Sequence, residues 1–166
     1  MSASIIRLLN LYVDGRGHAG EIETLTPPKL TIKTEEDRSG GRDAPVMQDV
    51  GMEVLTAEFT LKKFDTEVLS LFGLLDGADV PLTIRGGVDQ AGVVVPVVYN
   101  MRGKFTEIDE GEWQGGKKVE MKCSVALSFY KRTIDGKVIH EIDVNNAVRV
   151  INGVDQLQAY RDAAGL

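Results

Sequence analysis

The stretch Lys117–Tyr130, KKVEMKCSVALSFY, has the most regular alternation of apolar and polar side chains in the chain. A period of two is typical of a strand with one buried face, because successive side chains of a strand point to opposite sides. The apolar face consists of Val119, Met121, Cys123, Val125, Leu127 and Phe129. The turn pair Asp135-Gly136 follows, and then the apolar-rich Val138–Ile142. Together these segments predict a hairpin between Tyr130 and Glu141.

Other parts of the chain also have strand patterns. Thr56–Lys62 alternates cleanly, and Val93–Glu107 is rich in valine. Pro96 within the valine run indicates an edge strand or a bulge, and residues 86–92 are expected to form a glycine-rich loop before it. The remaining expected strands are Leu8–Val13, Glu21–Leu25 and Val80–Arg85. About eight strands with short connections predict a mainly antiparallel sheet.

Residues 29–52 predict a long hairpin. Lys29–Glu35 alternates as a half-exposed strand, and the strand pattern resumes at Val46. The polar tip between them has no apolar core, so the hairpin should project from the body. The tip comprises Glu35, Glu36, Asp37, Arg38, Ser39, Gly40, Gly41, Arg42, Asp43, Ala44 and Pro45.

Two segments predict helices. Asp65–Gly73 has Asp65 as N-cap, an apolar stripe and Gly73 at the C-terminal end. Gln156–Ala164 predicts a short C-terminal helix with Asp155 as its cap. The expected fold is therefore mainly β: an antiparallel β-sandwich or barrel with one packed α-helix, a projecting hairpin and a short C-terminal helix. Residues 1–166 are expected to form a single domain.

Composition excludes several classes of protein. The chain has 166 residues, 19 basic and 25 acidic side chains, and a net charge of −6. An acidic surface repels phosphate backbones at long range, which argues against a nucleic-acid-binding protein. A single cysteine excludes an intramolecular disulfide. No segment approaches the roughly 18 apolar residues of a membrane span, and no signal peptide is evident, so we expect a soluble chain made in the cytoplasm.

Each motif that suggests chemistry has a simpler interpretation. Residues 15–20, GRGHAG, match G-x-G-x-x-G, but the Pro27-Pro28 break leaves no room for the helix of a dinucleotide site. Cys123 could pair with His18 or His140 as a nucleophile, yet it lies on an apolar face that predicts an inert thiol.

Metal sites are also not expected. His140-Glu141-Ile142-Asp143 lacks a second nearby histidine, as a zinc site would need. The acidic cluster Glu107, Asp109, Glu110 and Glu112 lacks the spacing of an EF-hand. We therefore expect no catalytic, cofactor-binding or metal-binding residue, and a protein that is not an enzyme. Trp113, in a polar loop, is either an anchor for a partner or a clamp over the core.

The order and spacing of several short segments resemble a known family over nearly the whole chain. The chain is similar to the major tail tube proteins of P2-type contractile-tailed phages, a family that includes tube proteins of R-type bacteriocins. Its departures are Pro27-Pro28 and the length of the 86–92 loop. The resemblance rests on residues 10–15 (NLYVDG), 28–30 (PKL), 33–35 (KTE), 40–41 (GG), 43–46 (DAPV), 51–53 (GME), 67–69 (EVL), 71–73 (LFG), 130–131 (YK), 135–136 (DG), 141–143 (EID) and 152–155 (NGVD).

The resemblance implies a structural subunit that forms hexameric rings, which stack into a hollow tube inside a contractile sheath. It implies that the hairpin reaches the neighbouring ring, with Ser39-Gly40-Gly41 at its tip. The implied partners are other copies of the chain, the tail sheath protein, a baseplate or tube initiator and a tape-measure protein. DNA would pass through the lumen without sequence-specific binding in a phage, whereas a bacteriocin would use the tube for puncturing.

The implied location is a virion tail or a phage-tail-like particle, assembled in the bacterial host cytoplasm. If the lumen shares the chain's net negative charge, its wall would repel DNA. The alternative from residue chemistry is a carbohydrate- or peptide-binding β-sandwich, with Trp113 and the glycine loops forming its pocket. A small hydrolase using Cys123 or His140 is a third reading.

Overall fold

The computed structural model describes residues 3–75 and 78–166, which contain twelve strands and two short helices. The number of strands is larger than the eight expected, partly because it includes β2 and β12, which have only two residues each. The elements are β1 (Ile5–Val13), β2 (Arg16–Gly17), β3 (Ile22–Thr26), β4 (Ile32–Asp37), β5 (Val46–Met52), β6 (Leu55–Leu61), α1 (Thr66–Leu69), β7 (Val80–Gln90), β8 (Val93–Asp109), β9 (Met121–Ile134), β10 (Lys137–Asp143), β11 (Val148–Ile151), β12 (Val154–Asp155) and α2 (Gln158–Ala164).

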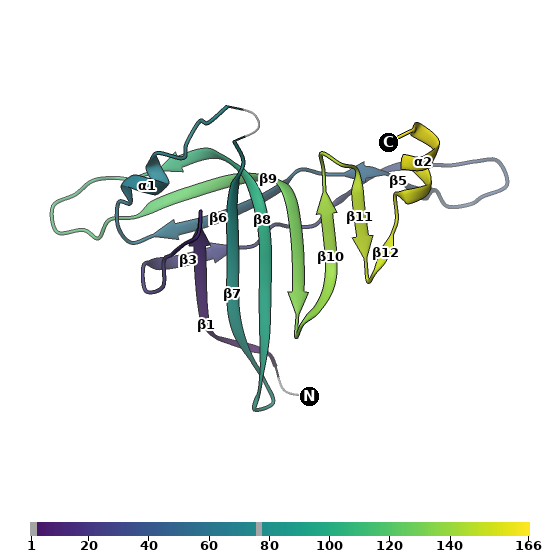
Figure 1. The fold of residues 1–166 in the computed structure, drawn as a ribbon. Coiled ribbons are helices and arrows are strands. Elements are labelled where there is room, and N and C mark those ends of the chain that lie inside the picture. The colour runs from purple at the N-terminus through teal and green to yellow at the C-terminus, as the bar shows by residue number, and fades with distance from the viewer. Residues whose placement is uncertain (1–2, 76–77) are drawn as a thin grey trace.

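Ten strands form one sheet that bends over itself to make two layers (Figure 1). One layer has the order β12-β11-β10-β9-β8-β7-β1-β2, and β6 and then β3 continue the other layer from the first half of β9. All pairings between these strands are antiparallel. The predicted mainly antiparallel β fold is confirmed.

The bend depends on Gly103. The β8–β9 register shifts between Arg102 and Gly103 and again between Phe105 and Glu107. A Cβ on Gly103 would lie 2.2 Å from the carbonyl oxygen of Ala126. Strands that pass from one layer to another commonly use such bends and bulges, so this corner requires a residue without a side chain.

The core lies between the two layers. Phe59 and Phe105 pack edge to face, with ring centroids 5.9 Å apart and planes at 85°. Each fully buried apolar side chain of this size contributes roughly 1.5–3 kcal/mol to folding. The core includes Leu11, Val13, Leu55, Ala57, Phe59, Leu61, Val68, Val80, Leu82, Ile84, Met101, Phe105, Met121, Cys123, Val125, Leu127, Tyr130 and Ile142.

The stretch predicted as the principal strand begins later than expected and extends further. β9 starts at Met121, and its first neighbour on β8 is Asp109, which pairs with Lys122. Residues 117–120 lie beyond the end of β8 and so have no partner strand there. The predicted turn at Asp135-Gly136 is confirmed, with Ile134 pairing Lys137 on either side of it.

The prediction of a loop over residues 86–92 is wrong. β7 continues to Gln90, and the turn to β8 is Ala91-Gly92, with φ of 54° and 86°. Gly86 and Gly87 remain in the strand because both β1 and β8 supply ladder partners. β8 pairs with β7 from Val93 but with β9 only from Val97 onward, so the stretch that contains Pro96 has one partner strand, as the edge-strand expectation at Pro96 requires.

Both helices differ from their predicted bounds. Asp65 caps α1 as expected, because its Oδ1 accepts hydrogen bonds from the N–H groups of Glu67 and Val68. α1 nevertheless ends at Leu69, and Phe72 forms a bridge with Phe105 instead of a further turn. α2 is present, but Asp155 contacts the Leu157 N–H and does not cap it. Within the described residues, no helix has the length and apolar character to span a membrane.

Candidate assembly surfaces

The predicted hairpin is present and stands apart from the large sheet. β4 and β5 pair from Ile32–Met52 to Asp37–Val46 and form a two-stranded sheet of their own. The predicted tip residues Glu35 to Pro45 occupy its distal half, with Glu35, Glu36 and Asp37 in β4 and the others in the connection. Figure 1 shows this connection extending away from the body. The hairpin is therefore ordered by its own backbone ladder.

Asp37 organises the tip. Its carboxylate accepts hydrogen bonds from Ser39 Oγ at 3.2 Å and Gln48 Nε2 at 3.1 Å, and Arg42 Nη1 lies 3.8 Å away. Gly41 has a φ of +87°, a left-handed conformation that glycine adopts without strain. Arg38 is exposed and has no ion-pair partner among the residues the structure describes. The tip thus holds one internally paired cation and one that is free to meet a partner.

The base of the hairpin is closed by one backbone hydrogen bond between its two arms and is joined to the body by one ion pair. The Glu53 N–H donates to the Thr31 carbonyl at 2.9 Å, and Arg149 on β11 lies 3.1 Å from the Asp49 carboxylate. The Gly51 N–H and then Arg149 hold the pKa of Asp49 below its usual range. These contacts set the direction in which the hairpin leaves the body.

The hairpin also exposes apolar side chains, which were not expected from the charged sequence of its tip. Ile32, Val46, Met47 and Val50 are each between 44% and 54% exposed. Apolar side chains gathered on an extension without a core are typical of a surface that a partner covers.

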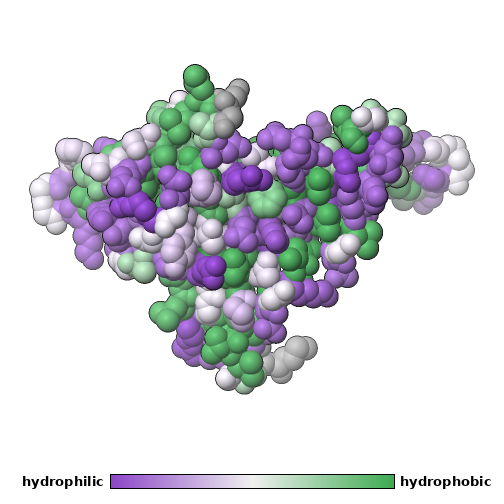
Figure 2. Space-filling view, viewed as in Figure 1, coloured by the Kyte–Doolittle hydropathy of each residue, from purple (hydrophilic) through white to green (hydrophobic). Residues whose placement is uncertain are grey.

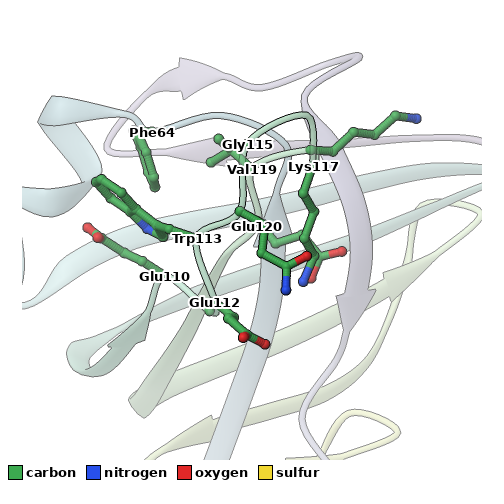
Figure 3. Close-up of a pocket in the computed structure, with 11 residues that line it drawn as sticks. Phe64, Glu110, Glu112, Trp113, Gly115, Lys117, Val119 and Glu120 are labelled. Carbon is green, nitrogen blue, oxygen red and sulfur yellow. The ribbon is translucent and has the colours of Figure 1, made fainter.

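A second candidate surface lies at the opposite end of the molecule, in the connection from β8 to β9 (Figure 1). Trp113 is 73% exposed and packs against Phe64, which is 38% exposed, with ring centroids 5.4 Å apart. Figure 3 shows these rings beside a pocket of about 320 Å³. We call it the Trp113 shelf; it is lined by Phe64, Glu110, Gly111, Glu112, Trp113, Gln114, Gly115, Lys117, Lys118, Val119 and Glu120.

Trp113 is too exposed to serve as a clamp over the core. That it anchors a partner, the other interpretation of its sequence position, stays a prediction. No local pattern indicates that Phe64, far away along the chain, is the neighbour of Trp113. Of the predicted acidic cluster, Glu107 and Asp109 lie in β8, whereas Glu110 and Glu112 line the shelf.

A third candidate surface is the free edge of the large sheet. β1 pairs with β7 along its length, but β2 pairs only with Tyr12 and Val13. The other edge of Ile5–Asn10 has no partner strand within the described residues. Ile6 and Leu8 on this strand are 64% and 79% exposed. Val93 and Val94, in the neighbouring β7–β8 hairpin, are 62% and 74% exposed. Figure 2 shows this apolar end at the bottom of the molecule, and such an edge is a template for pairing with another chain.

A buried polar network holds α1 onto the turn after β2. His18 Nδ1 lies 2.9 Å from Glu21 Oε2 and 3.6 Å from Asp65 Oδ2. These three residues place ligand atoms within 4.8 Å of one another, as a metal site would require. Lys63 already pairs with Glu21 at 2.7 Å, and Arg16 with Asp65 at 3.3 Å, so each carboxylate has a cationic partner and the group acts as a structural network.

Hydrogen bonds and charges in this network lower the pKa of both carboxyl groups. Lys63 and His18 hold the pKa of Glu21 below its usual range. Burial raises the pKa of Asp65, but the Val68 N–H, the Arg16 guanidinium and the Glu67 N–H together outweigh it and lower the pKa. The network was missed from the sequence, because Asp65 is distant along the chain and no local pattern connects it to His18.

The residues considered for catalysis lie apart. Burial raises the pKa of the Cys123 thiol to about 12, so it stays protonated and unreactive at neutral pH. His18 belongs to the network above, and His140 lies on β10, where its ring stacks on Tyr130. Residues 15–20, the G-x-G-x-x-G segment, cover the end of the β1–β2 turn, β2 and the turn that follows it, and they lead into β3 and not into a helix.

Comparisons with known proteins agree on one family. The family model described as phage tail tube protein FII matches residues 3–165. The tail tube protein of Escherichia phage P2 is 35% identical, with 97% of this chain and 96% of that protein covered. The major tail tube protein of Serratia phage KSP20 is 33% identical, with 86% and 84% covered.

Solved structures share the fold at low sequence identity. A chain from the sheath–tube complex of an extracellular contractile injection system (PVC, extended state) gives a TM-score of 0.61 at 11% identity, with 76% of this chain and 88% of that chain covered. A chain from the baseplate of the anti-feeding prophage gives 0.54 at 11% identity, with 80% and 97% covered. The chain therefore belongs to the phage tail tube protein FII family, and it is a structural, non-enzymatic tail tube protein.

Proposed function

We propose that this chain is the repeating subunit of the inner tube of a contractile tail, in which six copies close into a ring and rings stack into a hollow tube. The sheath–tube complex among the structural relatives supports the tube and its sheath as the setting. Residues 1–166 act in it as one domain, which the continuous ten-stranded sheet supports. We prefer this proposal to the alternative of a carbohydrate- or peptide-binding module, because that function would require a bound ligand.

The observation that carries this proposal is the open edge of β1. Unpaired backbone groups and exposed apolar side chains along Ile5–Asn10 are costly in an isolated subunit. At the far side of the sheet, β12 pairs with β11 over only two residues. This side of the sheet therefore also has few backbone hydrogen-bond partners within the described residues. Joining one side to the other in neighbouring copies is a head-to-tail contact, and such contacts close into a ring when the rotation fits.

The projecting hairpin is proposed to connect adjacent rings. Residues Glu35 to Pro45 extend beyond the sheet and contribute nothing to the core. Alternating charges at the tip can fix the register of stacking, because a misplaced partner would bring like charges together.

The lumen is proposed to be lined by the sheet face that the second layer leaves uncovered. Across the strands, the row Thr83–Asn100–Lys131–Glu141 alternates with the buried row Leu82–Met101–Tyr130–Ile142. Arg85 and Arg102 lie on the same face as the first row. A lumen formed by this face would carry both basic and acidic side chains, so it would not simply share the negative sign of the chain's net charge.

The remaining partners follow from the same proposal. They are the tail sheath protein, a baseplate or tube initiator and a tape-measure protein. DNA would pass through the lumen without sequence-specific binding, or the tube would puncture a target cell as in a bacteriocin. The subunit would be made in the bacterial host cytoplasm and end in a virion tail or tail-like particle.

Negative-stain electron microscopy of the purified chain at high concentration, with and without the native baseplate as seed, tests this proposal. We expect hollow tubes or stacked rings in the seeded sample. Discrete monomers or dimers in both samples would contradict it.

A further inference from the structure

A head-to-tail contact needs two different surfaces on opposite sides of one subunit. The hairpin tip and the Trp113 shelf meet this requirement, because they lie at opposite ends of the molecule (Figure 1). Both are exposed, and neither contributes to the core. The hairpin tip of one copy can therefore contact the Trp113 shelf of a second copy that lies next to it.

The shelf has the composition of a site for a cation. Phe64 and Trp113 present ring surface, and Glu110, Glu112 and Glu120 surround it (Figure 3). None of these three carboxylates has an ion-pair partner in the described ranges 3–75 and 78–166. Two lysines, Lys117 and Lys118, also line the pocket, so the acids outnumber the bases. An aromatic floor with surplus carboxylates favours a guanidinium over an anion.

The tip supplies such a group. Asp37 binds Ser39, Gln48 and Arg42, which holds the tip in one shape. Arg38, next to Asp37, keeps its charge unpaired within the part of the chain that is described. Arginine and tryptophan are the side chains most often found at the energetic centre of protein interfaces.

We propose that the Trp113 shelf receives the hairpin tip of a second copy of this chain, with Arg38 lying against Trp113 and between the shelf glutamates. This inference rests on the proposed function, because it names the surface that the hairpin contacts in the assembled tube. A guanidinium is attracted to the face of an indole, and its hydrogen bonds to carboxylates are of the stronger, charge-assisted kind.

The fluorescence of Trp113 tests the contact directly, since it is the only tryptophan. In the free subunit the exposed indole should emit at long wavelength and be readily quenched by acrylamide. In seeded tubes we expect emission at shorter wavelength and quenching reduced several-fold. Tubes that form with unchanged emission and quenching would overturn this inference and leave the proposed function standing, whereas absence of tubes would overturn both.

Charge reversal gives a second readout. Arg38→Glu should raise the protein concentration needed for assembly about tenfold, equal to about 1.4 kcal/mol. Lys33→Glu is the matched control, since Lys33 is also an exposed hairpin cation, and it should have a much smaller effect. Combining Arg38→Glu with Glu112→Arg should restore assembly. Equal effects of the two single variants, or no restoration, would count against the contact, and circular dichroism would verify that each variant is folded.

Discussion

The corner of the large sheet and the β4–β5 hairpin are both antiparallel strand pairs, but they have opposite environments. At the corner, β8 and β9 bury Met101, Phe105, Val125 and Leu127, and a glycine is required for the strands to approach. The hairpin buries almost nothing and exposes both charged and apolar side chains. The comparison indicates that the corner determines whether the subunit folds, whereas the hairpin determines which partner surface the folded subunit binds.

The largest effect is expected at the corner. Gly103→Val would force a side chain into the space held by the backbone of Ala126, and we expect a loss of more than about 3 kcal/mol in the free energy of unfolding, or no soluble protein. Gly40→Val is the matched control, because no atom lies within 4 Å of a Cβ at that tip position. Urea unfolding followed by circular dichroism measures both. Similar stability of the two variants would show that the corner tolerates a side chain.

An intermediate effect is expected in the buried network. Asp65→Asn removes a charged N-cap and the partner of Arg16, and should cost about 1–3 kcal/mol at pH 7. The pKa values of Asp65 and Glu21 are lowered in the folded protein, so their stabilisation is present above about pH 4 and is lost as the pH falls below it. The wild type should therefore lose more stability than Asp65→Asn on acidification. The exposed Asp43→Asn is the control, and equal acid sensitivity of all three proteins would refute the network's role.

A smaller effect is expected in alkali. Burial raises the pKa of both Cys123 and Tyr130 to about 12. A raised folded-state pKa gives stabilisation that is complete below the unfolded value and is lost as the pH rises toward 12. Unfolding free energy should fall above about pH 9, and less steeply in Cys123→Ala than in the wild type. Identical slopes in the two proteins would mean that the thiol is not protected by burial.

The smallest effect on stability is expected at the hairpin tip. Gly41→Pro cannot adopt the positive φ of Gly41, and Arg42→Glu breaks the pair with Asp37. Each should change the free energy of unfolding by less than about 0.5 kcal/mol and yet prevent tube formation. Gly40→Ala, with open space around it, should assemble normally. Normal polymerisation of both tip variants would show that the hairpin does not mediate assembly.

The parts of the fold that could be predicted were those where one local pattern had no competitor. The alternation from Met121 to Leu127, the Asp135-Gly136 turn and the Asp65 cap are of this kind, and so is the polar hairpin over residues 29–52. Beyond Leu127 the predicted faces are wrong, because the register shift at Gly103 puts Tyr130, and not Phe129, in the core. Prediction was wrong where tertiary pairing decided the outcome. Gly86 and Gly87 appear as a loop in the sequence, but β1 and β8 keep them extended.

The candidate surfaces were only partly accessible from the sequence. Trp113 was identified as a loop aromatic that is either an anchor for a partner or a clamp over the core, and its contact with Phe64 joins residues far apart in the chain. The free edge of β1 could not be anticipated either, because a strand is an edge only by virtue of its neighbours. The open edge, the hairpin and the shelf became visible as distinct surfaces only after the sheet order was known.

Cryo-electron microscopy of seeded tubes at side-chain resolution tests the central claim most directly. We predict a continuous barrel in which β1 of one subunit pairs with the far side of the sheet of its neighbour, the Thr83–Asn100–Lys131 row faces the lumen, and the hairpin leaves its own ring. Rings held by contacts that leave the β1 edge unpaired, or a lumen lined by the second layer, would contradict the account.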